Sequence, residues 1–410
     1  MPLRSLFVDF NSYFASVEQQ TRPELRNRPV GVVPVLSETT CCIAASYEAK
    51  QFGVKTGTLV HEARKLCPRI RIVEARPEIY VRYHNDLVAA VDSVLPVSSI
   101  QSIDEMACDL NGPFQQREKA LALAHQVKAT IASRVGPWMK CSIGIAPNDF
   151  LAKTASDMQK PNGLVVIESH DLPQCLYHLE LRDFCGIGRN MDARLRQHGI
   201  CTVEALCTAS ASTLRRAWGS IEGERLHAKL RGEVVYSPPT QKSSISHSHV
   251  LAPELRNDAD AYSVLNRLLQ KAAMRLRKDG YLAGAMGIYL KYTGGNDGWH
   301  QEMHFQETQD TIEFLRVMET LWQQRPSRPP GAPMQVGVYL LGLTDLHCRT
   351  LPLFGEGKAR PALNAVVDKL NTLYGKNTVY FGGAHTALQS APMRIAFNRI
   401  PDIETESDDC

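Results

Sequence analysis

Several features that define broad protein classes are missing from this sequence. It has no apolar run approaching the roughly eighteen residues of a membrane-spanning helix, and its start shows no apolar signal segment with a cleavage site. Lys and Arg outnumber Asp and Glu by only 46 to 43, too small an excess to indicate a nucleic-acid-binding protein by itself. We therefore expect a cytoplasmic protein without membrane contact, in which any site for a polyanion is built from local charge.

Cysteine, glycine and proline are present without a pattern that specifies a structure. The eleven cysteines include no C-x-x-C pair and no Cys/His cluster with zinc-ligand spacing, so we expect reduced thiols. Glycine (27) and proline (23) occur at ordinary frequency, which excludes collagen-like and low-complexity chains. The 410 residues, 44% hydrophobic and 22% charged, suffice for two to four globular domains of roughly 150 residues each.

The first part of the chain has the order of a ferredoxin-like α+β layer. Residues 1–10 and 75–167 follow a β…ββαβαβ order, with an insertion after the first strand. The predicted elements are strand 6–10, two strands within 97–110, helix 116–135, strand 141–145, helix 150–158 and strand 163–167. In the insertion, the pattern predicts helices at 11–20, 46–52 and 59–66 and a strand at 30–35.

The second part of the chain begins after a helical region and a linker. Residues 172–230 carry almost only helical signal, and the Pro/Ser composition of 234–244 is typical of an interdomain linker. The elements predicted beyond it are strand 247–251, helix 259–277, strand 285–292, helix 311–324, strand 335–341 and helix 362–374. The sequence thus predicts a second α/β segment.

Three carboxylates are predicted to meet at one edge of the first sheet. Asp9 ends a predicted strand, and Asp104 and Glu105 lie at the tip of a predicted hairpin. In a ferredoxin-like layer these two places are neighbours, and converging carboxylates are usually compensated by a hard divalent cation such as Mg²⁺. On these residues alone, an ordinary polar turn and a strand-end cap remain the simpler interpretation.

Four segments in a fixed order resemble a known family. They are LFVDFNSYFASVEQ at 6–19, ASYEAKQFGVKTG at 45–57, SIDE at 102–105 and SIGIAPNDFLAKTASDMQKPNG at 142–163. Together they closely resemble the Y-family of translesion DNA polymerases, over nearly the whole chain. The resemblance implies an α+β right-hand polymerase: a ferredoxin-like palm (1–10 and 75–165), small fingers (11–74), a helical thumb (166–235), a linker (236–241), an α/β little finger (242–345) and a tail (346–410).

The resemblance also implies a reaction and the residues that perform it. The reaction is low-fidelity, DNA-directed nucleotidyl transfer from a dNTP to a primer 3′-OH, with two Mg²⁺ ions for which Mn²⁺ can substitute. The implied metal ligands are Asp9, Asp104, Glu105 and the carbonyl of Phe10. The implied nucleotide contacts are Phe14 as a steric gate against the ribose 2′-OH, Tyr13 as its support, and Tyr47, Lys50 and Lys160 at the triphosphate.

Two segments resemble the family's DNA-contacting regions. Gly186 and Gly188 lie in a stretch similar to a helix-hairpin-helix, whose glycines let backbone N–H groups approach a DNA phosphate. Arg275, Arg277 and Lys278 form a basic helix end in the little finger. An ordinary helical hairpin and a solvated helix face are the alternative interpretations.

The tail contains a peptide that resembles a clamp-binding motif. Residues 349–354 read RTLPLF, and an extended segment of this kind places Leu351, Leu353 and Phe354 in an apolar pocket of a sliding clamp. Packing of the tail on its own domain is the alternative. The expected partners are primer–template DNA, dNTPs and a sliding clamp; we expect a monomer, and the need for accessory subunits is left open.

Two other functions were weighed against the polymerase. A damage-response scaffold would keep the fold and the clamp peptide without catalysis, but the three carboxylates argue against it. A palm-type nucleotide cyclase would leave the thumb and little-finger segments without a purpose. The prediction is therefore a translesion polymerase of DNA repair and the SOS response, and the lesion it bypasses cannot be read from the sequence.

Overall fold

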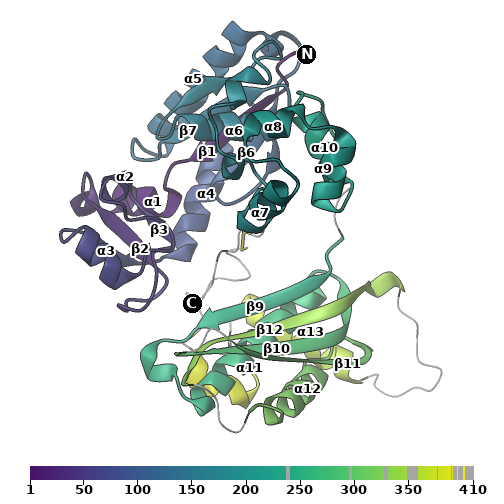
Figure 1. The fold of residues 1–410 in the computed structure, drawn as a ribbon. Helices are drawn as coiled ribbons and strands as arrows, with labels where there is room; N and C mark the ends of the chain where they lie inside the picture. Colours follow the sequence, from purple (N-terminus) through teal and green to yellow (C-terminus); the bar gives the residue numbers. More distant parts are fainter. Residues whose placement is uncertain are drawn as a thin grey trace. The chain divides into compact units, whose positions relative to one another are not determined.

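The computed structural model describes residues 1–236, 241–294, 298–326, 331–348, 359–375, 377–388, 390, 395 and 400–401. The chain divides into two compact units, Met1–Pro238 with Ile395–Ile400, and Pro239–Arg394 with Pro401–Cys410. Figure 1 shows that both units combine β-sheets and helices, with two sheets in the first unit and one in the second. None of the described helices is long and apolar enough to cross a membrane.

The first unit is built on a five-stranded sheet in the order β5-β6-β1-β7-β8. The strands are β1 (Ser5–Phe10), β5 (Val97–Ile100), β6 (Glu105–Asp109), β7 (Cys141–Ala146) and β8 (Leu164–Val166). The central strand β1 is buried along its whole length and pairs antiparallel with both β6 and β7. The predicted α+β class and the predicted strand–helix order are therefore confirmed.

Three helices pack against this sheet: α4 (Pro77–Asp92), α5 (Arg117–Arg134) and α6 (Asp149–Met158). The sequence analysis assigned no element to α4, although its buried residues Tyr80, His84, Leu87 and Val91 recur at helical spacing. Helix α6 approaches β7 very closely at Gly144, where an added Cβ would lie 1.9 Å from the carbonyl oxygen of Ala152. Only glycine permits this approach.

The insertion after β1 forms a small separate sheet with its own core. Its strands β2 (Val30–Val33), β3 (Ala44–Ala45) and β4 (Arg71–Glu74) have the order β3-β2-β4. The helices of this region are α1 (Tyr13–Thr21), α2 (Tyr47–Lys50) and α3 (Val60–Leu66). The Ser46 hydroxyl accepts a hydrogen bond from the Ala49 N–H, so it caps α2 as its sequence position predicts.

A helical region closes the first unit. It contains α7 (Arg189–Gln197), α8 (Val203–Thr208), α9 (Ala211–Trp218) and α10 (Glu222–Lys229). Its apolar residues share one core with α6, in which Phe184 stacks on Phe150 with ring centroids 5.9 Å apart. The helical region is thus fixed to the same helix that packs against β1 and β7.

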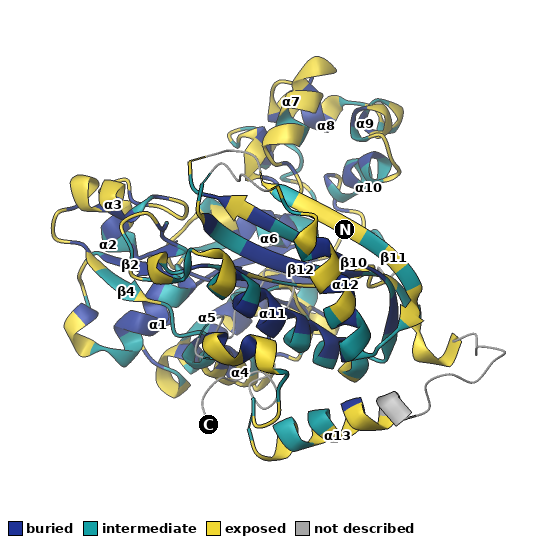
Figure 2. Ribbon diagram, turned by 90° about the horizontal axis from the view of Figure 1, so that it is seen from below, coloured by how far each residue is buried: buried dark blue, intermediate teal, exposed yellow. Residues whose placement is uncertain are grey.

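The second unit is a four-stranded antiparallel sheet in the order β11-β10-β12-β9. The strands are β9 (Ser244–Val250), β10 (Tyr281–Tyr292), β11 (Trp299–Thr308) and β12 (Pro333–Asp345), and its helices are α11 (Asp258–Lys278), α12 (Thr311–Gln323) and α13 (Ala359–Leu373). Figure 2 shows α11 buried and α13 mostly exposed. The sequence analysis missed β11, an edge strand in which no residue is fully buried.

The sheet of the second unit carries two tyrosines that lie over glycines of the neighbouring strand. Gly287 pairs with Tyr339 and Gly337 pairs with Tyr289. A Cβ added at Gly287 would meet the Tyr339 ring at 2.2 Å, and one added at Gly337 would meet the Tyr289 ring at 2.3 Å. The two glycines therefore make room for the two rings on this face of the sheet.

Candidate active site

Strand pairing brings Asp9 and Glu105 face to face. They are register partners in the antiparallel β1–β6 ladder, and the N–H of Phe10 donates to the carbonyl of Asp104 at 2.8 Å. Asp9 is only 4% exposed. The three carboxylates predicted to converge are thus neighbours at one end of the sheet, because two strand ends 95 positions apart meet there.

Burial makes this cluster unfavourable for negative charge. It raises the pKa of Asp104, an effect to which nearby Asp9 adds and which a hydrogen bond from the Ser102 hydroxyl (2.6 Å) partly opposes. Burial also raises the pKa of Glu105, and Lys153 opposes that rise. Burial therefore makes it unfavourable to hold these carboxylates together in their charged form. A hard divalent cation stabilises the charged form of every carboxylate that it binds, so this set of oxygens fits such an ion.

Two lysines contact these carboxylates. Lys160 Nζ lies 2.7 Å from Asp9 Oδ2 and 2.6 Å from Asp157 Oδ1. Lys153 Nζ lies 2.5 Å from Asp9 Oδ2 and 2.6 Å from Glu105 Oε1. The sequence motifs marked Lys160 but not Lys153, which lies on α6, the helix that packs against β1. No sequence signal distinguishes Lys153 from a solvated lysine.

Asn11 joins the end of β1 to the turn that follows Lys160. Its Oδ1 accepts the backbone N–H of Asn162 at 2.7 Å, and its Nδ2 donates to the Ser142 hydroxyl at 3.0 Å. Lys128 Nζ reaches the same turn and donates to the Asn162 carbonyl at 2.7 Å. These bonds hold the turn that carries Lys160 next to the strand that carries Asp9.

Phe14 and Tyr13 occupy different environments on α1. Tyr13 is buried and its hydroxyl donates to the Tyr80 carbonyl at 2.6 Å, as expected of a supporting residue. Phe14 is partly exposed and stacks on Tyr80, with ring centroids 4.7 Å apart. Tyr80 in turn donates to the buried carboxylate of Glu18 at 2.9 Å, so the Phe14 ring rests on a fixed partner.

Tyr47 and Lys50 lie within electrostatic reach of Lys160. Lys50 Nζ is 4.4 Å from the centre of the Tyr47 ring, one turn away on α2. Burial lowers the pKa of Lys50 and the charge of Lys160 lowers it further. Burial raises the pKa of Tyr47, and Lys160 opposes that rise. The structure therefore gathers a hydroxyl and two ammonium groups beside Asp9, a set suited to a polyanion.

The predicted glycine pair lies at the start of α7. Gly186 has a left-handed backbone (φ 89°), and Gly188 is the N-cap residue of α7. A Cβ added to either glycine would have no atom within 4 Å. The preceding element is only a 3₁₀ turn, Leu181–Asp183, rather than a full helix. Three arginines line the hollow around the glycines: Arg182, Arg189 and Arg194.

The basic end of α11 is engaged within the second unit. Arg277 forms two bonds with Asp368 of α13, at 2.6 and 2.8 Å, and also donates to the hydroxyl of Thr311 at 2.9 Å. Arg275 Nε lies 3.6 Å from Asp279. The structure places Lys278 in the same last turn of the helix. Sequence alone gave no sign of the Asp368 contact.

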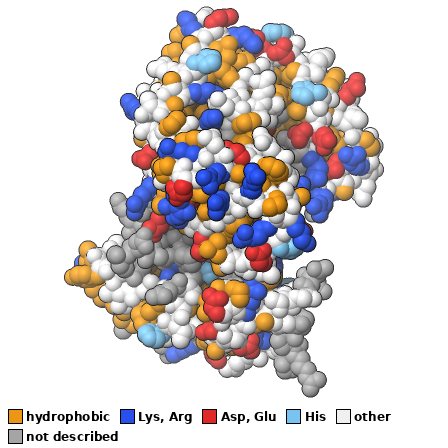
Figure 3. All heavy atoms as spheres, turned by 90° about the vertical axis from the view of Figure 1, so that its left-hand side faces the viewer, with side chains coloured by type: hydrophobic (Ala, Val, Ile, Leu, Met, Phe, Trp, Pro, Cys, Tyr) orange, Lys and Arg blue, Asp and Glu red, His pale blue; other side chains and the backbone are white. Residues whose placement is uncertain are grey.

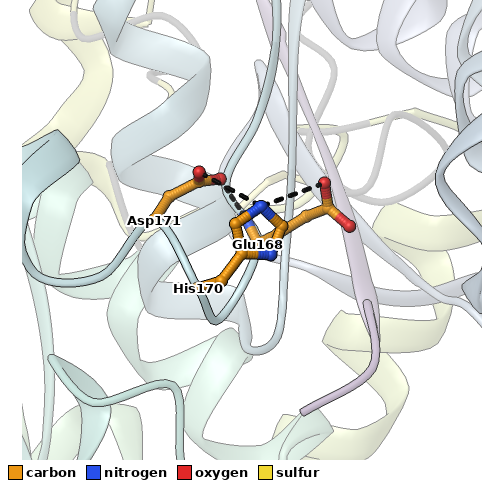
Figure 4. Close-up of side chains that lie close together, drawn as sticks. All are labelled: Glu168, His170 and Asp171. Carbon is orange, nitrogen blue, oxygen red and sulfur yellow. Dashed lines mark hydrogen bonds and ion pairs between the residues drawn. The ribbon is translucent and has the colours of Figure 1, made fainter.

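Some predicted residues fall outside the described part of the chain. Leu351, Leu353 and Phe354 of the clamp-like peptide lie there, as do residues 237–240 of the expected linker. Among the described residues, one group offers three ligand atoms that all lie within 4.8 Å of one another: Glu168, His170 and Asp171, shown in Figure 4. Glu168 is paired there with Arg117 of α5 at 2.9 Å, so a structural ion pair accounts for it.

Comparison with known proteins agrees with this geometry. Residues 8–157 match the impB/mucB/samB family and residues 242–352 match the impB/mucB/samB family C-terminal domain. DNA polymerase IV of Moorella thermoacetica is 33% identical over 389 residues, covering 92% of this chain and 94% of the relative. DNA polymerase IV of Pelotomaculum thermopropionicum is 32% identical, covering 91% and 93%.

Solved structures share the fold. A Y-family DNA polymerase chimera of Dbh and Dpo4 superimposes with a TM-score of 0.70 at 23% identity, covering 83% of this chain and 99% of that one. An insertion ternary complex of Dbh DNA polymerase has a TM-score of 0.54 at 24% identity, covering 82% and 98%. From the sequence matches and this shared fold, the chain belongs to the Y-family of DNA polymerases and is a DNA-directed DNA polymerase.

Proposed function

We propose that this polymerase synthesises DNA across damaged template bases by two-metal nucleotidyl transfer, with Asp9, Asp104 and Glu105 as its catalytic carboxylates. The observation that supports it most is the meeting of Asp9 and Glu105 as register partners at the end of β1 and β6. These carboxylates, with the Phe10 carbonyl, would hold two Mg²⁺ ions, for which Mn²⁺ can substitute. When bound, the ions supply activation of the primer 3′-OH and stabilisation of the leaving pyrophosphate.

The residues around Lys160 bind the incoming dNTP in this proposal. Lys160, Lys50 and the Tyr47 hydroxyl bind the triphosphate, because they are the cationic and donor groups gathered beside Asp9. Phe14 occupies the space that a ribose 2′-OH would need, and its stacking on Tyr80 keeps the ring from moving aside. The site therefore orients the nucleotide and selects the deoxyribose.

Primer–template DNA is held by the helical region. Gly186 and Gly188 are exposed, and the arginines of the same hollow suit a DNA phosphate. Figure 3 shows Lys and Arg side chains spread over one face of the first unit. In the second unit, Arg275 and Lys278 are the proposed phosphate contacts; Arg277 can take part only if its bonds to Asp368 break.

The finer assignments follow from the family resemblance. We propose the palm, fingers, thumb and little finger with the boundaries given above, and a monomer that works in the cytoplasm as part of the SOS response. A sliding clamp would bind residues 349–354, with Leu351, Leu353 and Phe354 as anchors. A Leu353→Ala/Phe354→Ala double variant tests this point: clamp affinity should fall roughly 30- to 1000-fold while basal synthesis survives.

A primer-extension assay tests the proposed function. The full chain is given each dNTP singly on an undamaged template and on templates with a damaged base. We expect incorporation opposite at least one lesion, more misinsertion than a proofreading polymerase makes, and dependence on Mg²⁺ or Mn²⁺. Synthesis that stops at every lesion tested would contradict the translesion role, and undiminished synthesis by Asp104→Ala would contradict the assigned carboxylates.

A further inference from the structure

Lys153 lies between the two facing carboxylates of the site. It is on α6, and its Nζ contacts Asp9 Oδ2 at 2.5 Å and Glu105 Oε1 at 2.6 Å. Its side chain is only 17% exposed. Helix α6 packs against β1, the strand that carries Asp9, as Figure 1 shows. The ammonium group is therefore placed where it joins both register partners of the β1–β6 ladder.

This placement has a specific electrostatic consequence. Two carboxylates held face to face in a partly buried site repel one another, and a single ammonium between them offsets that repulsion. Burial acts to lower the pKa of Lys153, but the charges of Asp9, Asp157 and Glu105 outweigh it and raise the pKa. The Lys153 ammonium lies against Asp9 Oδ2 and Glu105 Oε1, the same carboxylate oxygens that a divalent cation would take as ligands.

Asp157 gives both lysines a further partner outside the β1–β6 ladder. It lies one turn beyond Lys153 on α6, with its Oδ2 3.3 Å from Lys153 Nζ. Its Oδ1 lies 2.6 Å from Lys160 Nζ. Asp157 is not on a strand of the sheet, and its side chain is 36% exposed. An ammonium that leaves Asp9 and Glu105 can therefore remain paired without crossing the site.

We propose that Lys153 is the internal counter-ion of the metal-free enzyme, which holds Asp9 and Glu105 together and transfers to Asp157 when a divalent cation takes the two carboxylates. Lys153 is a positioning residue in this role, since it acts through the carboxylates. The inference rests on the proposed metal site at Asp9, Asp104 and Glu105. Its tests measure metal affinity and stability, which do not depend on turnover.

The first test is the affinity of the full chain for Mn²⁺, measured by electron paramagnetic resonance without DNA or nucleotide. Lys153→Met removes a competing charge, so Mn²⁺ should bind about tenfold more tightly or better. Unchanged or weaker binding would show a merely structural lysine and overturn the proposal. Lys128→Met is the matched control: it deletes a half-buried lysine that bonds to the carbonyls of Cys141 and Asn162, and Mn²⁺ affinity should not rise.

The second test concerns Asp157, whose substitution should weaken Mn²⁺ binding rather than strengthen it. Asp157→Asn removes the place to which the ammonium moves, so Mn²⁺ should bind several-fold more weakly, by roughly 3- to 10-fold. In the Lys153→Met background the same substitution should weaken binding less, because only Lys160 then loses Asp157 as a partner. Equal weakening in both backgrounds would overturn the transfer to Asp157. Because Asp157 is partly exposed, its substitution tests the idea even if Lys153→Met folds poorly.

The third test is the melting temperature with and without divalent cation. In EDTA, Lys153→Met should melt below the wild type because Asp9 and Glu105 repel one another, and added Mn²⁺ should close the gap. A gap that persists in Mn²⁺, as expected for Lys128→Met, would overturn the counter-ion role. Asp104→Ala separates the two hypotheses: wild-type Mn²⁺ binding that survives this substitution means that the proposed metal site itself is wrong.

Discussion

Asn11 accepts the backbone N–H of Asn162 at 2.7 Å, across 151 positions of the chain. Asn162 has a left-handed backbone (φ 58°) in the turn after Lys160, and Asn11 follows Asp9 and Phe10 at the end of β1. The same Asn11 side chain donates to Ser142 of β7. One buried amide thus joins the strand that carries Asp9, a proposed catalytic carboxylate, to the turn that carries Lys160, a proposed triphosphate contact.

Asn11→Ala should therefore weaken nucleotide binding more than it slows chemistry. Loss of the amide leaves the Asn162 N–H without its partner and costs about 1–3 kcal/mol of stability. The freed turn misplaces Lys160, so KM for dNTP should rise several-fold while kcat changes less. Single-nucleotide kinetics measure both. Asn11→Asp, which keeps the acceptor oxygen, should restore most of the KM; an unchanged KM in Asn11→Ala would rule out the positioning role.

Asp104→Ala should abolish nucleotide incorporation and leave primer–template affinity nearly unchanged. The carboxylate is proposed to hold metal, whereas the helical region and the second unit are proposed to hold DNA. Incorporation is measured by primer extension and affinity by fluorescence anisotropy. Incorporation above a few per cent of the wild type would contradict the assignment, and a large loss of DNA affinity would show that the substitution disturbs more than the metal site.

Phe14→Ala should admit ribonucleotides. A 2′-OH forced against the stacked Phe14 ring costs roughly 1–3 kcal/mol by analogy with an overpacked core, so dNTP selectivity should fall at least about tenfold when the ring is removed. The ratio of kcat/KM for dCTP and rCTP gives the answer. Tyr13→Phe is the control, because it keeps the buried ring and removes only the bond to the Tyr80 carbonyl. Selectivity that stays at the wild-type value in Phe14→Ala would exclude this residue as the gate.

Gly144→Ala should destabilise the first unit. The new methyl group would lie 1.9 Å from the Ala152 carbonyl oxygen, so α6 must move away from β7. We expect a loss of about 1–3 kcal/mol in the free energy of unfolding, measured with urea. Gly188→Ala is the matched control, since its added Cβ meets no atom and its φ of −84° suits alanine. Equal stability of the two variants would refute the close approach of α6.

His84 should make stability fall with decreasing pH. It is buried on α4, with Nδ1 2.8 Å from the Ile103 carbonyl, and burial lowers its pKa below the ordinary value of 6.5. As the pH falls below 6.5, the unfolded chain takes up a proton that the folded chain refuses. The folded state then loses about 1.4 kcal/mol for each pH unit over which only the unfolded chain is protonated.

Urea unfolding between pH 7.5 and pH 5 measures the contribution of His84. His84→Gln keeps a donor for the Ile103 carbonyl and has no proton to gain, so its stability should fall less than that of the wild type over the same range. Parallel pH profiles for the two proteins would mean that His84 is not buried as described.

The order of elements along the first sheet could be predicted because local patterns carry it. Alternation, helix caps and apolar runs placed β1, β6, β7 and α6 within a few residues of their bounds. Four elements were missed: β3, β4, α4 and β11. Strands β3 and β4 have only two and four residues. The edge strand β11 has no fully buried residue, and α4 was overlooked despite its helical spacing of buried residues.

The residues of the candidate site also divide into those that the sequence predicted and those that only the structure identified. The sequence predicted that Asp9, Asp104 and Glu105 could meet, because a strand end and a hairpin tip are neighbours in this strand order, but only the resemblance to the family favoured this over an ordinary polar turn. It also marked Phe14 and Lys160 through the family motifs. The roles of Lys153 and Arg277 were decided only by tertiary structure. The sequence does not distinguish a lysine or arginine that is surrounded by water from one that is paired with a carboxylate.

Packing of α6 on β1 places Lys153 between Asp9 and Glu105, and Arg277 of α11 pairs with Asp368 of α13. Each of these contacts joins residues at least 48 positions apart, as Lys153 and Glu105 are. The sequence fixes no distance over such separations. The physical reason is that an ion pair forms only where two charged side chains end close together. The register of the strands and the packing of the helices determine where those side chains end.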